Sequence, residues 1–111
     1  MAEMRLREAS FLILSALAGG PRHGYGIIKD VQAQSDGAVV LRVGTLYGAL
    51  DRLAGEGLIE FDHEEVMDSR LRRYYRLSTA GAVRLEQEAQ RSRREAELAL
   101  SRLATGKALP A

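Results

Sequence analysis

The sequence has 111 residues, of which 46% are hydrophobic and 28% charged, and it contains no cysteine. This length suits one domain with one modest core and excludes a large multidomain enzyme, and without cysteine there can be no disulfide, thiolate zinc site or cysteine nucleophile. The net charge of +1, from 16 basic and 15 acidic residues, argues against a protein that binds polyanions over its whole surface.

Two helices and a short strand are predicted in the first part of the chain. Apolar residues recur at helical spacing from Leu6 to Leu17 and predict a buried first helix, which ends at the residues Gly19 to Pro21. The segment from Gly24 to Ser35 predicts a second helix that ends at the Asp36-Gly37 turn signal. After that turn, Val39 to Leu41 predict a short strand.

A third helix is predicted near Val43 to Ala54. Leu46, Leu50 and Leu53 recur at i, i+4 and i+7, which places them on one buried face. The residues left on or beside the opposite face are Thr45, Tyr47, Gly48, Asp51 and Arg52.

The next segment predicts a β-hairpin. Its strands are Leu58 to His63 and Leu71 to Leu77, joined by a polar turn around Met67 to Ser69. Side chains alternate between the two faces of a strand, so Tyr75 and Leu77 are expected in the core and Arg73 near the tip, beyond the core.

A long terminal helix is predicted from about Thr79 to Leu103, with Ser78 as its N-cap. Its run of alternating charges is so polar that the helix needs a partner. The whole pattern predicts a mainly α fold with a small β-hairpin. It consists of a winged helix-turn-helix domain at residues 1–78, a dimerisation helix at 79–105 and a frayed tail at 106–111.

Catalytic, metal-binding and membrane patterns are missing from the sequence. His23 and His63 lack metal-ligand spacing, and His23 is expected to be a cap or loop residue. The G-x-G at Gly24 to Gly26 lacks the third glycine and preceding strand of a nucleotide fingerprint. No apolar run reaches the roughly 20 residues of a membrane span, and the N-terminus lacks a signal-peptide core. We therefore expect a soluble cytoplasmic protein that is not an enzyme, has no cofactor and binds no membrane.

Four further motifs follow one another along the chain. They are H-G-Y-G-I-I-K at His23 to Lys29, G-T-L-Y-x-A-L-x-R-L at Gly44 to Leu53, G-L-I at Gly57 to Ile59, and R-R-Y-Y-R-L-S at Arg72 to Ser78. In this order they resemble the PadR family of bacterial transcriptional regulators, in its shorter subgroup with one terminal helix. The resemblance covers roughly Leu6 to Leu85. It implies a homodimeric winged-helix repressor, often released by a small phenolic, drug-like or other hydrophobic effector.

The chain departs from this family in two respects. Family members commonly have Ser-Pro where Arg42-Val43 stands, so the start of the third helix is less tightly specified. The chain also has no tryptophan, so a planar ligand cannot stack between paired tryptophans.

Five residues in and beside the third helix are expected to contact double-stranded DNA. Thr45 and Tyr47 lie at its leading end, although Thr45 could instead cap the helix and Tyr47 could lie at the rim of the core. Gly48 leaves room for the sugar-phosphate backbone. Arg42 could reach a phosphate at the helix N-terminus. Arg52, a turn or more further along, could contact a phosphate or pair with Glu56.

Three more DNA-binding candidates lie outside that helix. Arg70 and Arg72 bracket the hairpin tip and could bind phosphates or enter a minor groove. Tyr25 resembles a family position near the DNA backbone and could equally be structural. The acidic first strand offers an alternative for the hairpin arginines, in which Glu60, Asp62 or Glu64 pair with Arg72 or Arg76. Arginine preference suits phosphate and guanine contacts, but a GC-rich coding bias would give the same composition.

The dimer is expected to form through the terminal and first helices. It would bury some combination of Leu6, Phe11, Leu98, Leu100 and Leu103. Two recognition helices would then read an inverted repeat with half-sites roughly 10 base pairs apart. A small hydrophobic effector is expected to enter between the terminal helices and the DNA-binding domains. The alternative function is a winged-helix adaptor for proteins, because the fold alone does not fix function.

Overall fold

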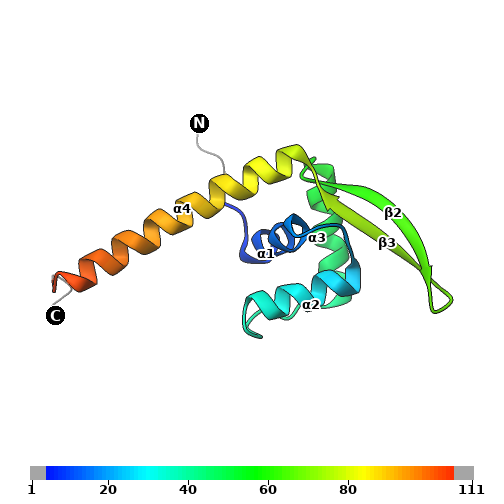
Figure 1. The fold of residues 1–111 in the computed structure, drawn as a ribbon, viewed down its shortest axis with the longest axis horizontal. Coiled ribbons are helices and arrows are strands. Elements are labelled where there is room, and N and C mark those ends of the chain that lie inside the picture. Colours follow the sequence, from blue (N-terminus) through cyan, green and yellow to red (C-terminus); the bar gives the residue numbers. More distant parts are fainter. Residues whose placement is uncertain (1–4, 107–111) are drawn as a thin grey trace.

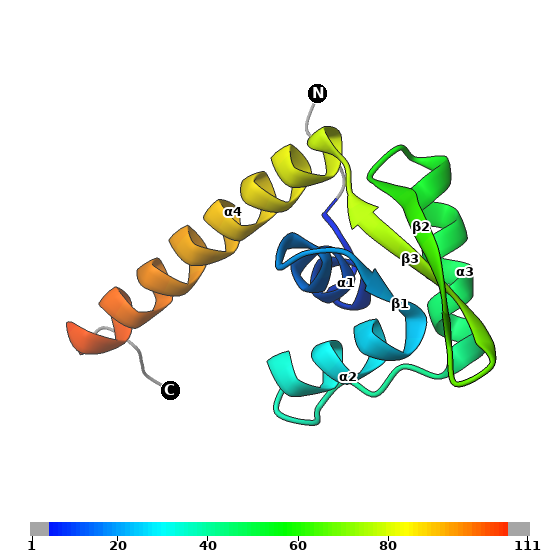
Figure 2. The same cartoon turned by 45° about the vertical axis from the view of Figure 1, so that its right-hand side comes forward.

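The computed structural model describes residues 5–106. Its elements are α1 (Glu8–Ala18), β1 (Arg22–His23), α2 (Gly24–Gln34), α3 (Val43–Gly55), β2 (Ile59–Met67), β3 (Arg70–Leu77) and α4 (Thr79–Ala104). Helices α1, α2 and α3 form a cluster with the sheet beside it, and α4 extends away from this cluster (Figures 1 and 2). The predicted α+β class is therefore confirmed.

The core lies between the first three helices and the base of the hairpin. Leu46, Leu50 and Leu53 are each at most 1% exposed, which confirms the predicted buried face of α3. They pack with apolar residues of α1 and α2 and with Leu41 from the loop before α3. This packing fixes the direction of α3, so its polar face points away from the protein.

The predicted strand at Val39–Leu41 is wrong. These residues form an irregular segment, in which the backbone N–H of Val39 donates to Ser35 Oγ at 2.9 Å and Leu41 is buried. The third strand of the sheet is β1, which pairs antiparallel with Tyr74 and Tyr75 of β3 in the order β1-β3-β2. Three β-branched or apolar residues do not make a strand unless an unpaired strand edge lies beside them. The edge of β3 is not available to Val39–Leu41, because β1 already pairs with it.

The hairpin is longer than predicted. Its register runs from Ile59 opposite Leu77 to Met67 opposite Arg70, with an irregularity between Phe61 and His63. Asp68 and Ser69 both have positive φ, as a two-residue turn with the right hairpin twist requires. Tyr75 and Leu77 pack against the core, as predicted.

Helix α4 begins as predicted. Ser78 Oγ accepts from the backbone N–H of Gly81 at 2.9 Å and donates to the carbonyl oxygen of Gly57 at 2.6 Å. Arg5 ties the N-terminal segment to α4 through Glu88, Glu95 and Ser92. From Ser92 to Ala104 every residue is exposed.

Two predictions concern the rest of the chain. The predicted frayed tail at residues 106–111 lies outside the described residues, except for Gly106. Among residues 5–106, none of the helices has the length and apolar character needed to cross a membrane.

Candidate nucleic-acid interface

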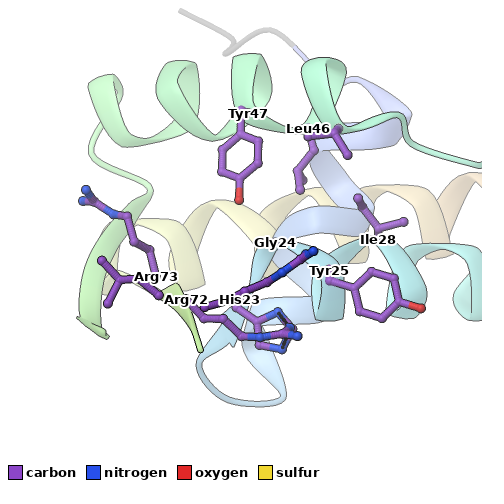
Figure 3. Close-up of a pocket in the computed structure, with 11 residues that line it drawn as sticks. His23, Gly24, Tyr25, Ile28, Leu46, Tyr47, Arg72 and Arg73 are labelled. Carbon is purple, nitrogen blue, oxygen red and sulfur yellow. Dashed lines mark hydrogen bonds between the residues drawn. The ribbon is translucent and has the colours of Figure 1, made fainter. Parts of the chain in front are cut away.

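A hollow of about 530 Å³ lies between the N-terminal ends of α2 and α3 and the second strand of the hairpin (Figure 3). Four of the predicted DNA-binding residues line it, namely Tyr25, Tyr47, Arg70 and Arg72. Arg73 also lines it but was placed only near the hairpin tip by the sequence pattern. The fold thus brings together residues from three separate motifs.

Tyr47 points from α3 toward α2, with its hydroxyl above Gly24 (Figure 3). A Cβ atom on Gly24 would lie only 2.7 Å from that hydroxyl oxygen, so a larger residue there would have to displace the phenol. Tyr47 is 44% exposed, which leaves part of its ring and hydroxyl accessible. The two interpretations of Tyr47, a rim residue and a DNA contact, are therefore compatible.

Tyr25 lies on the outer side of α2 and is 59% exposed. Its ring is near the ammonium group of Lys29, with Nζ 5.5 Å from the ring centroid. A core position for Tyr25 is therefore ruled out, and its ring is accessible beside the hollow.

His23 and Arg72 meet where β1 adjoins β3. His23 Nδ1 accepts from the backbone N–H of Gly26 at 3.2 Å, so His23 is the N-cap of α2, as predicted. Arg72 Nη1 lies 3.2 Å from both ring nitrogens of His23. The Nε atom of Arg72 is buried and has no hydrogen-bond partner among residues 5–106. Arg72 therefore keeps an unused donor next to the hollow.

Cross-strand ion pairs engage a different arginine. Arg76 donates to Glu60 at 3.2 Å and to Asp62 at 3.1 Å, which confirms the predicted hairpin pairing for this residue. His63 hydrogen-bonds the same Asp62, and these two partners, His63 first, hold the pKa of the Asp62 carboxyl below its usual value. Arg76 is thus neutralised.

The aromatic ring of Tyr74 lies on the same face of the hairpin as these ion pairs. It stacks on His63 with centroids 4.4 Å apart and meets His23 edge-on at 5.2 Å. A hydrogen bond to Glu65 raises the pKa of the Tyr74 hydroxyl. On the other face, the Arg73 guanidinium lies 4.7 Å from the ring centroid of Phe61. Each of these contacts joins β3 to β2 or β1. Together they hold β3, the strand that carries the hairpin arginines, in place.

The structure separates Arg52 from the other candidates. Its Nη2 donates to Ser10 Oγ at 2.8 Å, and it lines a second hollow on the α1 side of α3. Ser10 is 42 residues away in sequence, so no local pattern could show this contact. The observed hydrogen-bond partner of Arg52 is therefore Ser10 and not Glu56, and Arg52 is still exposed.

Arg42, Thr45 and Gly48 are exposed at the start of α3. Arg42 occupies the N-cap position without a side-chain hydrogen bond, and the helix begins at Val43 all the same. A Cβ atom on Gly48 would meet nothing within 4 Å, so the space in front of this turn is open. All three lie on surface that a macromolecule can approach.

We expect the free energy of unfolding to fall at acidic pH because of His23. Burial, and next the charge of Arg72, lower the pKa of His23 from its ordinary value of 6.5. The folded state therefore favours the neutral ring, so this stabilisation is complete above about pH 6.5 and is lost as the pH falls through the lowered pKa.

Asparagine at position 23 would cap α2 without titrating. Urea unfolding of the wild type and of His23→Asn at pH 7.5 and pH 5 would measure the difference, and His63 is common to both proteins. Equal pH dependence in the two proteins would contradict the role given to His23.

The arrangement of α1, α2 and α3, followed by a hairpin beside the start of α3, defines a winged-helix fold of the kind that binds DNA. Residues 13–87 match the Transcriptional regulator PadR-like family. The chain therefore belongs to this family of transcriptional regulators.

Similar proteins include solved structures from several bacteria. A PadR family transcription regulator from Clostridium difficile R20291 is 28% identical, with a TM-score of 0.73 over 87% of this chain and 99% of that one. Bacillus subtilis PadR in complex with operator DNA is 23% identical, with a TM-score of 0.64 over 73% of this chain and 46% of that one. The second similarity is one of fold.

A relative known from sequence is an uncharacterised 37.1 kDa protein in transposon TN4556 of Streptomyces fradiae. It is 38% identical over 86 residues, which cover 78% of this chain and 23% of the relative. The chain thus spans under a quarter of the length of that protein.

Proposed function

We propose that this protein is a sequence-specific DNA-binding repressor that acts in the cytoplasm as a homodimer on an inverted-repeat operator. The observation that carries the proposal is the position of Arg70, Arg72 and Arg73 beside the exposed leading end of α3. Within residues 5–106, the ion pairs of the protein involve none of these three arginines. Their charges are therefore available to phosphate groups.

The expected complex places α3 in a major groove and the hairpin against the flanking backbone. Thr45 and Tyr47 would meet the DNA first, because they lie in the first turn and a half of α3 and are exposed. Arg42 precedes the free N–H groups of this helix, where an anion is favoured. Base contacts from Thr45 would then give sequence preference, and the arginines would give affinity that depends on salt.

One observation favours the alternative of a protein-binding adaptor. Five carboxylate residues lie along the hairpin, against four arginines, so the hairpin as a whole is not basic. The acidic residues are Glu60, Asp62, Glu64, Glu65 and Asp68. Two of them are matched by Arg76, but Glu64, Glu65 and Asp68 are exposed and would be repelled by phosphate.

The salt dependence of DNA binding separates these two functions. A selection from genomic fragments, including the region upstream of this protein's own gene, would first supply the target. We expect Arg70→Ala and Arg72→Ala each to reduce the slope of log affinity against log salt by about one. Thr45→Ala should leave the slope unchanged and relax the sequence preference.

Arg94→Ala is the matched control, because Arg94 is an exposed arginine on α4, away from the hollow. It should bind DNA as the wild type does. If no fragment is retained above the non-specific level, DNA recognition is excluded and the adaptor function is favoured.

The proposal includes a small hydrophobic effector that enters between α4 and the DNA-binding domain. Such a ligand releases DNA only if it binds more tightly to the arrangement that fits the operator poorly. The apolar residues exposed on α4, including Leu100 and Leu103, support an apolar interface and do not by themselves identify a ligand. Calorimetry with a panel of hydrophobic compounds tests it, and the absence of both heat and operator release would count against it.

A further inference from the structure

The outward edge of α3 carries a single side chain, the carboxylate of Asp51. This edge is formed by Gly44, Gly48, Asp51 and Gly55, which recur at i, i+4, i+7 and i+11 on the side of the helix opposite its buried leucines. All four residues are exposed. A Cβ atom on any of the three glycines would meet nothing within 4 Å, so the space around this edge is open. The Asp51 carboxylate is therefore free to meet whatever the outer face of α3 meets.

Asp51 does not contribute to the stability of the fold through a partner. The ion pairs and side-chain hydrogen bonds within residues 5–106 do not involve its carboxylate. The residues three and four positions away on α3 are uncharged, so no ion pair along the helix is possible. Asp51 also lies just before the last turn of α3, where the helix dipole does not favour an anion.

The charge of Asp51 is not neutralised by its neighbour. Arg52 is the other charged residue of α3, and its Nη2 donates to Ser10 Oγ on α1 at 2.8 Å. The outer edge of α3 therefore presents a negative charge, although the proposed function brings this helix to a polyanion. A phosphate group near Asp51 would be repelled. If α3 lies in a major groove, the carboxylate has to face the base edges rather than the sugar-phosphate backbone.

A carboxylate only accepts hydrogen bonds, and few groups in the major groove donate them. Guanine and thymine present carbonyl oxygens, which repel a carboxylate. Adenine presents its amino group beside the acceptor N7, which repels the second carboxylate oxygen. Cytosine presents its 4-amino group with no acceptor beside it on the same base. The base edge that suits Asp51 is therefore that of cytosine.

We propose that Asp51 determines target preference by accepting a hydrogen bond from the 4-amino group of one cytosine in each half-site. This inference rests on the proposed function and adds to it a residue that selects against wrong sequences. On any other sequence the charge of Asp51 is unpaired and faces acceptors or phosphates, so binding is weakened there. Asp51 thus lowers non-specific affinity as well as selecting the target.

The base preference at every operator position tests the inference, measured by competition binding for the wild type and two variants. The wild type is expected to prefer cytosine at one position in each half-site by at least about fivefold, the lower end for a specific base contact. Replacing this cytosine by 2-pyrimidinone, which lacks only the amino group, should weaken binding as much. Asp51→Asn should move the preference to adenine, because an amide both accepts from N6 and donates to N7. Asp51→Ala should lose the preference and bind non-specific DNA more tightly.

Asp36→Asn is the matched control, because it removes the same charge from an exposed aspartate in the turn after α2. Asparagine also adopts the positive φ of 52° found at Asp36. This variant should keep every base preference of the wild type. Urea unfolding midpoints of both Asp51 variants should be no lower than that of the wild type, since Asp51 has no partner to lose.

Two results would overturn the inference while the proposed function stands. One is an Asp51→Asn variant that keeps the wild-type preference at every operator position. The other is a wild-type preference for a base other than cytosine at the position that the Asp51 variants affect. A wild type that retains no genomic fragment specifically would instead refute the proposed function, and this inference with it.

Discussion

Substituting Gly81 by alanine is expected to destabilise the fold by on the order of 3 kcal/mol and to loosen α4 from the domain. A Cβ atom at this position would overlap the carbonyl oxygen of Leu58 and lie 2.9 Å from both its carbonyl carbon and Leu77 Cδ1. Because the first two are backbone atoms, no change of rotamer relieves the overlap. The same Leu58 carbonyl accepts from the backbone N–H of Ser78 at 3.1 Å, so the whole junction would have to move.

Gly55→Ala provides the matched control. Gly55 is the last residue of α3, and a Cβ atom there would meet nothing within 4 Å. Alanine is the better helix former by roughly 0.5–1 kcal/mol, so this variant should be as stable as the wild type or more so. Urea unfolding midpoints compare the two. A wild-type midpoint for Gly81→Ala would show that the junction between β2 and α4 is looser than the structure indicates.

Local signals in the sequence account for the helices and the hairpin. Leu46, Leu50 and Leu53 share one helical face because of their spacing alone, and Ser78 caps α4 through a bond to a residue only three positions away. The packing role of Gly81 was not visible in the same way. It depends on the carbonyl of Leu58, which only the path of the intervening hairpin brings close.

The missed strand has a similar cause. Two residues, Arg22 and His23, are too few to show an alternation, and they become a strand only because Tyr74 and Tyr75 offer an edge. The segment Val39–Leu41 has the composition of a strand and no edge to join. Composition therefore predicted the wrong one of the two.

The sequence predicted which residues belong to the candidate interface better than it predicted how they are arranged. Tyr25, Tyr47, Arg70 and Arg72 do meet around one hollow. Periodicity could not distinguish Arg52, which is turned toward Ser10, from residues on the outer face of α3. Nor could it show that Arg72 lies against His23, 49 residues earlier, while Arg76 pairs with acidic residues. These choices are made by tertiary neighbours.

Leu100→Asp is expected to abolish the proposed dimer and to lower operator affinity by at least about a hundredfold. Two monomers bind the two half-sites independently, so they lose the affinity that a dimer gains by linking the two binding events. Leu100 and Leu103 are 65% and 62% exposed on the part of α4 that extends from the domain (Figure 1). With 3.6 residues per turn, they share a stripe with Ala89 and Ala96. A helix segment of this length needs packing on such a stripe to be stable.

Leu98→Asp is the matched control, since it introduces the same charge at a leucine that is 50% exposed on the same helix. Leu98 was predicted with Leu100 and Leu103 as a dimer residue, but helical geometry places it on nearly the opposite side of α4. Sedimentation at micromolar concentration should show a dimer for the wild type and Leu98→Asp and a monomer for Leu100→Asp. Dissociation by both variants would refute the stripe as the interface. A monomeric wild type would refute the dimer and, with it, the two-fold symmetry of the operator.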